Sequence, residues 1–490
     1  MSQDIASPQS RQFVLVAAIL ASSMAFIDGS VISIAIPAIR ADLGASLAEA
    51  QWVSNGYLLF LSALILLGGA AGDRFGLRKV FGLGIVAFVV ASIACAIAPT
   101  PYMLVVARAV QGIGAAFMVP GSLAIIAKAY PREERGRAIG IWAAASSLTS
   151  IAGPIIGGFV LTALGDWSWR LVFAVNLPLG LAALALLWLK VAADKAEPGR
   201  RLDVVGAVLA TVSLMLIAFG LTGDGSDSLP PLSHTILWSG AGLVVGAAFL
   251  VWEARSNAPM LPLRLFASKA FSGANALTFA LYFALGGTMF FLPMTMIGGW
   301  GQSPATVSLA LLPLGIALTI LSSFSGKWAD RFGPGPLIAL GSLIVAAAFT
   351  GLGLTAPLHN VWFAVLPCIV LLGLGMGLVV SPLSTAVMTS VDDSDTGVAS
   401  GVNNAVARVA GLVAIALLGV VVASVFEQSL GSAAELPVFF GLPAPGLNAE
   451  DEALRLAATD AAFAAVAYVT AALSVVSAIV AWVTLERKLG

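Results

Sequence analysis

The chain has little charge for its length. Charged residues make up 10% of its 490 residues and hydrophobic residues 59%, whereas a soluble protein carries about 25% charge. Too few polar side chains are present to cover a globule, so the sequence predicts an all-α integral membrane protein with lipid as its solvent. The formal net charge of −1 provides no basic face for phosphates, and we expect no nucleic-acid partner.

Side chains that bind metals are also scarce. The two cysteines, Cys95 and Cys368, lie in apolar runs and are expected to be small buried hydrophobes rather than a disulfide. The histidines are His234 and His359, and no CxxC pair is present, so we expect no metal and no other cofactor. The sequence contains no GxxxxGK[ST] motif, which excludes this phosphate loop as a direct ATP site.

Long apolar runs, by contrast, recur along the whole chain. A membrane-spanning helix needs about 20 such residues, and fourteen runs of that length can be counted. An even number of spans places both termini on one side. The runs are, roughly, 13–36, 52–72, 79–98, 102–127, 138–163, 171–190, 204–222, 235–252, 271–297, 305–325, 337–355, 361–383, 397–425 and 463–484.

Basic residues gather in the loops of one side. Because such loops stay in the cytoplasm, we expect a multi-pass protein of the inner (cytoplasmic) membrane with both termini cytoplasmic. The opposite loops hold only Arg40, Arg170 and Arg455. The basic loops contain Arg74, Arg78, Lys79, Lys128, Arg132, Arg135, Arg137, Lys190, Lys195, Arg200, Arg201, Arg255, Arg264, Lys269, Lys327 and Arg331.

One carboxylate, Asp28, falls near the middle of a predicted span. An ionised group there costs about 2.5–3.5 kcal/mol on insertion scales, and such residues usually have a function. Apolar surroundings favour its protonated form, which suits a proton carrier. Arg108 also lies in an apolar run and stays charged, so we predict that Asp28 and Arg108 form a proton-coupling pair. Alternatively, Asp28 caps a helix break at Gly29 or is a static partner, and Arg108 extends to the interface.

The two ends of the chain repeat each other weakly. GGAAGDRFGLRK after the second run returns as SGKWADRFGPGP after the tenth, which predicts two homologous halves with a site between them. We expect six-helix bundles at 1–200 and 257–490 and an inserted helix pair at 201–256. A long outer loop at 426–462 is acidic and partly apolar, and it is either an ordered excursion over the outer leaflet or cavity mouth or a disordered connector.

The repeated loop predicts a conformational latch. A carboxylate there can sit at the N-terminus of a helix from the other half, where the helix dipole favours it, and break away in a second state. Alternatively, the loop is a turn whose charges only set topology. The latch residues are Gly69, Asp73, Arg74, Gly76, Arg78 and Lys79, with Asp330 and Arg331 in the repeat.

Two further sets of residues suggest packing and binding roles. Gly153, Pro154, Gly157 and Gly158 predict a kinked, closely packed helix at the interface of the halves. Polar, aromatic and thioether side chains in several spans are candidates for a substrate cavity, although packing or lipid contact would also explain them. These candidates are Trp52, Asn55, Tyr57, Gln111, Met289, Phe290, Met294, Asn403, Asn404 and Arg408.

Several of these motifs resemble those of one transporter family. Gly69-x-x-x-Asp73-Arg74-x-Gly76-x-Arg78-Lys79, Arg108-x-x-Gln111-Gly112-x-Gly114 and Gly153-Pro154-x-x-Gly157-Gly158 are similar to the signatures of the major facilitator superfamily. FIDGSVISIAIP, DWSWRLVFAVNLP and WEARSNAPMLPLRLF resemble its fourteen-helix drug:proton antiporters. The resemblance implies the major facilitator fold, two six-helix bundles plus two inserted helices.

The same resemblance implies a function. It indicates a proton-driven exporter of lipophilic drugs, with the lipid bilayer, protons and a small-molecule substrate as partners; nothing in the sequence indicates a periplasmic adaptor. A single buried acid predicts monocationic or neutral cargo rather than dications. An exporter of a metabolite, lipid or siderophore is the alternative on this fold. A membrane enzyme or a channel is disfavoured, because neither a nucleophile–base set nor a selectivity ring is visible.

Overall fold

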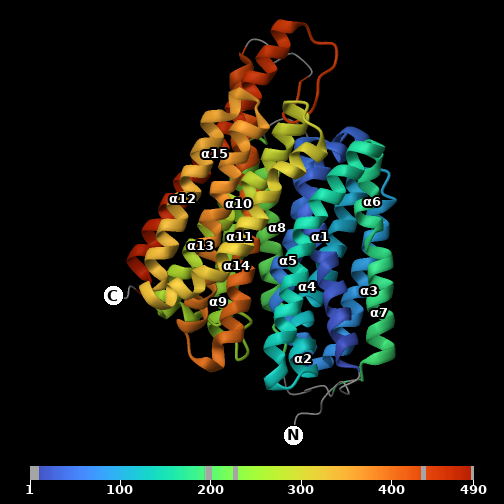
Figure 1. Cartoon of the computed structure of the whole chain (residues 1–490), viewed down its shortest axis with the longest axis vertical. Coiled ribbons are helices and arrows are strands. Elements are labelled where there is room, and N and C mark those ends of the chain that lie inside the picture. Colours follow the sequence, from blue (N-terminus) through green and yellow to red (C-terminus); the bar gives the residue numbers. More distant parts are fainter. Residues whose placement is uncertain (1–9, 193, 195–200, 224–229, 432–437, 487–490) are drawn as a thin grey trace.

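The chain folds into a bundle of long helices that run along one common direction (Figure 1). The structure is a computed structural model, and it describes residues 10–192, 194, 201–223, 230–431 and 438–486. Within these ranges there are fourteen helical spans long and apolar enough to cross a membrane, and no strand. The expected all-α membrane fold with fourteen spans is confirmed.

Six spans build the amino-terminal half, and local signals set where they begin. Ser46 and Glu49 form a capping box at the start of the second helix, and Pro101 follows the capping Thr100 at the fourth. The spans are α1 (Arg11–Leu43), α2 (Leu47–Phe75), α3 (Leu77–Ala96), α4 (Pro101–Ala129), α5 (Arg132–Leu164) and a sixth made of α6 (Trp169–Ala174) and α7 (Asn176–Lys190) after a 3-10 turn at Asp166–Ser168.

The other eight spans follow in the same manner. Short 3-10 and π turns extend or connect several of them, at Leu263–Ala267, Thr295–Gly299, Ala356–Leu358, Val361–Val365 and Asp393–Asp395. The inserted pair is α8 (Val204–Thr222) and α9 (Leu232–Arg255), and the carboxy-terminal half contains α10 (Lys269–Met294), α11 (Pro304–Phe332), α12 (Pro334–Thr355), α13 (Leu366–Thr389), α14 (Thr396–Leu430) and α15 (Ala449–Thr484).

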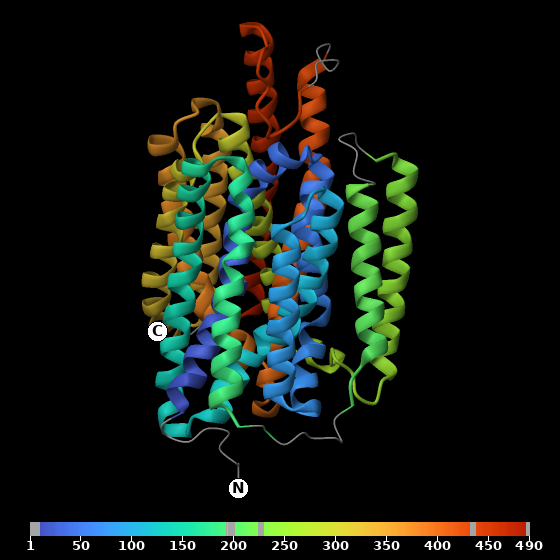
Figure 2. The same ribbon diagram turned by 90° about the vertical axis from the view of Figure 1, so that its right-hand side faces the viewer.

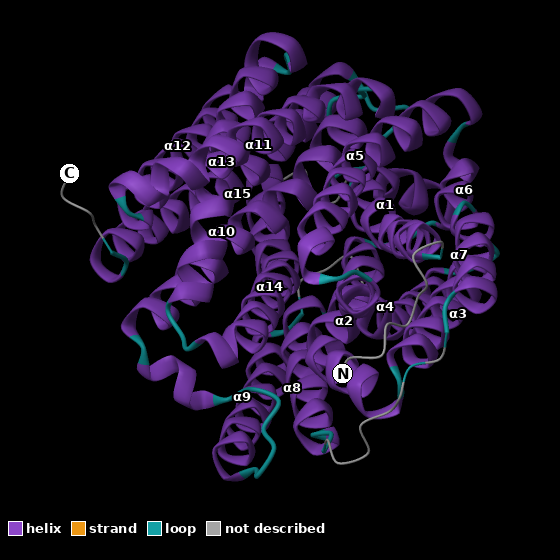
Figure 3. Ribbon diagram, turned by 60° about the horizontal axis from the view of Figure 1, so that its bottom comes forward, coloured by secondary structure: helices purple, strands orange, loops and turns teal. Residues whose placement is uncertain are grey.

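The two halves meet along two seams. Helices α5 and α11 pack together at one seam, and α2 and α14 at the other. The α8–α9 hairpin stands at the side of the molecule (Figure 2), where α8 contacts both α2 and α14 (Figure 3). The inserted pair therefore borders the second seam and leaves the first one uncovered.

Small residues bring helices together in equivalent places of the two halves. A Cβ added to Gly112 of α4 would lie 2.4 Å from the carbonyl oxygen of Tyr57 in α2. A Cβ added to Gly373 of α13, its counterpart in the repeat, would lie 3.0 Å from the carbonyl oxygen of Leu314 in α11. The repeat seen in the sequence thus reproduces one backbone-to-backbone contact in each half.

The helices define two ends of the molecule. We call the end at which α1 begins and α15 finishes the terminal end, and the opposite end the far end (Figure 1). The expectation of a single long loop at 426–462 is wrong for most of its length, because α14 continues to Leu430 and α15 already begins at Ala449. Residues 432–437 of that segment lie outside the described residues.

The acidic part of that segment starts a helix for a physical reason. Glu450, Asp451 and Glu452 occupy the first turn of α15, where the helix dipole favours negative charge. The side chain of Asn448 accepts hydrogen bonds from the amides of Glu450 and Asp451, at 3.0 and 2.9 Å. The acidic residues, which indicated a solvated loop, therefore form the N-terminus of α15. This helix extends beyond the apolar run that predicted the span.

The apolar part of the segment folds back onto the far end. Phe440 is 3% exposed, and its ring lies 6.2 Å from that of Phe291 in α10 and 6.0 Å from that of Phe426 in α14. Its carbonyl oxygen accepts a hydrogen bond of 2.5 Å from Arg40 of α1. Residues 438–448 are therefore ordered, as the first of the two alternatives predicted. They connect the two halves at the far end.

Candidate functional site

An ion pair between Asp28 of α1 and Arg108 of α4 lies inside the amino-terminal half. Nη1 of Arg108 is 2.5 Å from Oδ2 of Asp28, and the side chains are 1% and 0% exposed. Helix α1 runs through Gly29 without interruption, so Asp28 caps no helix break. Arg108 does not extend to the interface, because its Nε donates to the carbonyl oxygen of Val53 at 3.0 Å. The structure brings the predicted pair together.

Gln111, one turn after Arg108, is the second side chain that binds the carboxylate of Asp28. Its Nε2 donates to Oδ1 of Asp28 at 3.0 Å and to the Ser92 hydroxyl at 2.9 Å, and its Oε1 accepts from Arg108 at 2.6 Å. The amide of Asn176 also donates to the Ser92 hydroxyl, at 3.2 Å. The network thus joins α1, α3, α4 and α7, and every ionised group in it has a partner.

Sequence reasoning did not identify Ser92 and Asn176. Both are fully buried, and a polar residue in an otherwise apolar run was the only available signal. Aromatic rings close the network on another side, because the guanidinium carbon of Arg108 lies 4.4 Å from the centre of the Tyr57 ring and 5.6 Å from that of Phe173. At these distances both rings attract the guanidinium through cation–π contacts.

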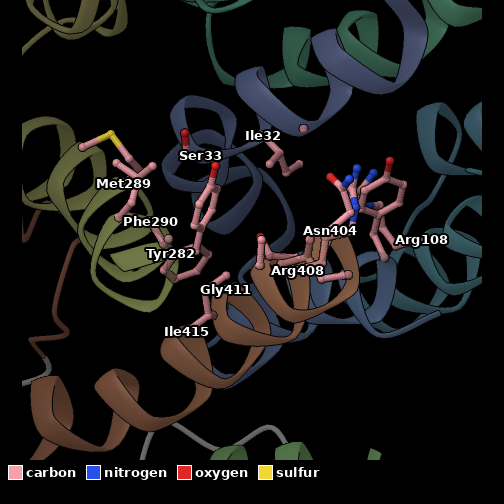
Figure 4. A pocket seen from close by; sticks show the side chains of 17 residues that line it. Ile32, Ser33, Arg108, Tyr282, Met289, Phe290, Asn404, Arg408, Gly411 and Ile415 are labelled. Carbon is pink, nitrogen blue, oxygen red and sulfur yellow. The ribbon is translucent and has the colours of Figure 1, made fainter. Parts of the chain in front are cut away.

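A cavity of about 400 Å³ lies next to this network, between the two halves. Figure 4 shows its wall, with Tyr282 and Phe290 on α10, Arg408 on α14 and Arg108 on α4. Its volume is in the range of pockets that hold drug-sized molecules. The lining residues are Gly29, Ile32, Ser33, Ser54, Tyr57, Leu58, Arg108, Tyr282, Leu285, Gly286, Met289, Phe290, Asn404, Ala407, Arg408, Gly411 and Ile415.

Half of the expected cavity residues line this space. Tyr57, Met289, Phe290, Asn404 and Arg408 do so. The others belong to the packing around it, because successive helical residues point about 100° apart and only one face of each helix reaches the cavity. The expected residues that do not line it are Trp52, Asn55, Gln111, Met294 and Asn403.

Specific contacts account for these corrections. The amide of Asn403 donates to Thr278 at 2.8 Å and to Asn275 at 3.2 Å, which ties α14 to α10. Met294 is fully buried, and Asn55 is buried with neither polar side-chain atom hydrogen-bonded. Asn403 and Met294 therefore contribute to packing between helices, which was the alternative interpretation of these residues.

Trp52 and Gln111 are held elsewhere. Trp52 packs against a small cluster of Leu59, Ala218 and Leu412, which lies between α2, α8 and α14. Gln111 is fully buried and belongs to the Asp28 network described above. The residues that sequence reasoning missed on the cavity wall are mostly aliphatic or glycine, and these types give no signal in a membrane helix.

The glycines of α5 lie at the seam with α11. A Cβ on Gly157 would lie 2.6 Å from a methyl of Val31 in α1, and one on Gly158 would lie 2.0 Å from the Ser308 hydroxyl of α11. That hydroxyl donates to the carbonyl oxygen of Pro154 at 2.8 Å. Gly153 also faces α1, so this motif joins α1, α5 and α11, and α5 remains continuous through Pro154.

Further hydrogen bonds between the halves cluster toward the far end. The amide of Ala305 donates to Thr162 at 2.9 Å, and Nε2 of Gln51 donates to the carbonyl oxygen of Ile415 at 2.5 Å. Toward the terminal end α5 and α11 carry exposed side chains instead, such as Ile141 at 46% and Phe324 at 51%. The hydrogen bonds that join the two halves thus lie toward the far end, whereas α5 and α11 carry exposed side chains toward the terminal end.

The repeated loop forms the same turn in both halves. Gly76 has φ +95° and Gly333 φ +84°, a backbone region that favours glycine. The guanidinium carbons of Arg74 and Arg331 each lie 5.3 Å from the neighbouring phenylalanine ring. Gly69, Asp73, Lys79 and Asp330 lie on the same helix ends, near the terminal end.

A carboxylate does occupy a helix N-terminus at this loop, but it is Asp194. Its oxygens accept from the amides of Leu77 and Arg78, at 2.8 and 3.0 Å, and from Lys128 at 3.2 Å. The guanidinium of Arg78 donates to the carbonyl oxygen of Trp188 at 2.9 Å. These contacts stay within the amino-terminal half, so the latch between the halves stays a prediction.

Comparison with known proteins gives consistent results. A sequence model described as Major Facilitator Superfamily matches residues 18–415 and, in a second match, 278–489. The tetracenomycin C resistance and export protein of Streptomyces glaucescens is 33% identical over 420 residues, 84% of this chain and 76% of the relative. The methylenomycin A resistance protein of Bacillus subtilis is 32% identical over 415 residues, 84% and 87% of the two chains.

Solved structures match over nearly the whole chain. A bacterial homolog of the human lysosomal transporter Spinster, in an inward-facing, unoccupied conformation, gives a TM-score of 0.71 at 18% identity, covering 98% of this chain and 97% of its own. The xylose transporter XylE from E. coli, in an inward open conformation, gives 0.62 at 15% identity with the same coverage. At these identities the similarity concerns the fold.

Proposed function

The chain belongs to the major facilitator superfamily, within its drug-efflux transporters, and from this premise we propose that it is a proton-coupled antiporter that exports small lipophilic compounds across the cytoplasmic membrane. It is a transporter and not an enzyme. Its relatives are named for resistance to, or export of, antibiotics and drugs. Proton coupling, the direction of transport and the cargo are the parts that we propose.

The observation that carries the proposal is the buried Asp28–Arg108 pair beside the cavity. In the described arrangement Arg108 and Gln111 stabilise the ionised carboxylate. Protonation of Asp28 removes the charge that holds Arg108, and the guanidinium then needs another partner or water. The Asp28–Arg108 pair then has two states, one with Asp28 ionised and one with Asp28 protonated. Binding of one proton shifts the equilibrium between the two positions of the halves.

The positive-inside rule supports placing the terminal end in the cytoplasm. With the halves joined at the far end, this arrangement then corresponds to a state that accepts cargo from the cytoplasm. Asp28 would take up its proton from outside in the opposite state and release it inward. One proton that crosses about 100 mV supplies about 2.3 kcal/mol, before any pH gradient is added.

The cavity supports lipophilic cargo, because tyrosine, phenylalanine and aliphatic side chains form most of its wall. The cavity gives less support to the expectation of a monocationic cargo, since the described residues of its wall include Arg108 and Arg408 but no carboxylate. The alternative is an exporter of an endogenous metabolite, lipid or siderophore. In its favour, one relative is named as a probable actinorhodin transporter of Streptomyces coelicolor, 33% identical over 444 residues.

Dye efflux from vesicles with an imposed pH gradient tests the proposal. Asp28→Asn and Arg108→Ala should each abolish uphill export. Asp42→Asn is a matched control, because Asp42 also lies on α1 and also pairs with an arginine, Arg170, at the surface; it should leave export nearly unchanged. Uphill export by Asp28→Asn at the wild-type rate would refute the assignment of the proton site.

A further inference from the structure

The charges that face the central cavity do not cancel. Both oxygens of Asp28 are engaged by Arg108 and Gln111, and the carboxylate side chain is 0% exposed, so it presents no negative charge to a ligand. The same contacts balance the charge of Arg108. Among the residues that the structure describes, none that lines the cavity is acidic, which leaves Arg408 as the charge in the wall that no carboxylate balances.

The guanidinium of Arg408 lacks a partner of its own. Within the described part of the chain it forms no hydrogen bond and no ion pair, and its Nε is buried without a hydrogen-bond partner. Arg408 lies about three turns from the start of α14 at Thr396, well inside the span. A cation at that depth is costly, so a ligand that carries a negative charge would compensate it.

The rest of the wall suits a flat apolar body. Tyr57 comes from α2 of one half. Tyr282 and Phe290 come from α10 of the other half (Figure 4). Aromatic side chains such as these stack on planar ring systems. A Cβ added to Gly411 would meet no atom within 4 Å, so open space lies on α14 one turn beyond Arg408.

We propose that this cavity takes planar aromatic compounds that carry one ionised acidic group, with Arg408 binding that group and the aromatic residues of both halves holding the rings. The proposal rests on the proposed export function and names its substrate class. A guanidinium presents a planar fork of N–H donors that matches a carboxylate or phenolate better than an ammonium does.

The charge of the cargo changes how the membrane potential drives transport. Outward movement of a monoanion with inward movement of one proton transfers two charges in the direction that an inside-negative potential favours. Outward movement of a monocation against one proton transfers no net charge. Anion export should therefore respond to the potential even without a pH gradient.

Binding to the purified protein tests the substrate class without any gradient. The probes are fluorescein, used at mildly acidic pH where only one of its two acidic groups is ionised, and rhodamine 123, a cation with the same xanthene ring system. We expect fluorescein to bind more tightly, and Arg408→Gln to weaken fluorescein binding about tenfold or more while leaving rhodamine 123 unweakened. Arg408→Lys should restore part of the loss. Tighter binding of rhodamine 123, or fluorescein binding indifferent to Arg408→Gln, would overturn the proposal.

Two further measurements keep the result interpretable. Gly411→Leu fills the cavity without changing its charge and should weaken both dyes; unchanged binding would place the site elsewhere and overturn the proposal. The thermal unfolding midpoint of each variant reports whether it folds. Transport in vesicles distinguishes the failure of proton coupling from the failure of the substrate class. If fluorescein binding requires Arg408 but transport does not depend on protons, proton coupling is refuted and the proposed substrate class is retained.

Discussion

Arg108 and Asp28 form a buried ion pair between α4 and α1, with side chains 1% and 0% exposed. Loss of one partner from such a pair leaves a buried charge without compensation and costs about 3–5 kcal/mol. We expect Arg108→Gln to lower the thermal unfolding midpoint strongly. The double variant Asp28→Asn, Arg108→Gln should recover much of the loss, and equal midpoints for the single and double variants would contradict this account.

The contact between α5 and α11 should control opening of the far end. A side chain on Gly158 would meet the Ser308 hydroxyl at 2.0 Å and the Pro304 carbonyl oxygen at 2.7 Å, so Gly158→Val should push the two helices apart. We expect a cysteine placed at Ala305 to react several-fold faster with a membrane-impermeant maleimide. Gly140→Val is the control, because a Cβ there meets no atom within 4 Å; an equal effect of both variants would rule out this mechanism.

Arg40 should stabilise the closed far end. It is fully buried and donates to the carbonyl oxygens of Ala45 and Phe440, at 3.1 and 2.5 Å. Arg40→Met keeps the length of the side chain but loses hydrogen bonds from a charged group, which contribute about 1.5–3 kcal/mol. Thermal unfolding should show this loss. Arg170→Met, at a partly exposed ion pair, should cost less than about 1 kcal/mol, and the reverse order would contradict the prediction.

Asp194 should make stability depend on acidic pH. Burial raises its pKa, but hydrogen bonds from the amides of Arg78 and Leu77 and from Lys128 outweigh burial and hold the pKa below the usual 3.8. A group whose pKa falls on folding stabilises the protein above its unfolded pKa, and this contribution disappears as the pH falls through the folded value.

The pH dependence can be measured by thermal unfolding. Asp194→Asn should lower the unfolding midpoint at pH 7, and the difference from the wild type should shrink as the pH falls below about 4. Lys128→Met, which removes only the partly exposed partner, should have a smaller effect. A difference between wild type and Asp194→Asn that stays constant from pH 7 to pH 3 would contradict the assignment.

The sequence predicted contacts correctly where a residue has few possible partners. Asp28 and Arg108 could be paired in advance because no other acid lies at that depth, and a buried arginine needs a partner. The cavity wall was predicted less well. Asn403 and Asn404 are neighbours in the chain, yet one binds α10 and the other faces the cavity, and only the rotation of α14 decides between them.

By itself the sequence determined the membrane environment, the fourteen spans, the repeat and the acid–base pair, because each follows from composition or from the cost of charge in lipid. Tertiary structure alone decided that the acidic run at Glu450 begins a helix, that Asp194 occupies the N-terminus of α3, and that Arg408 faces the cavity without a carboxylate. These features depend on which faces of distant helices meet, and a pattern of residues along one chain does not specify those contacts.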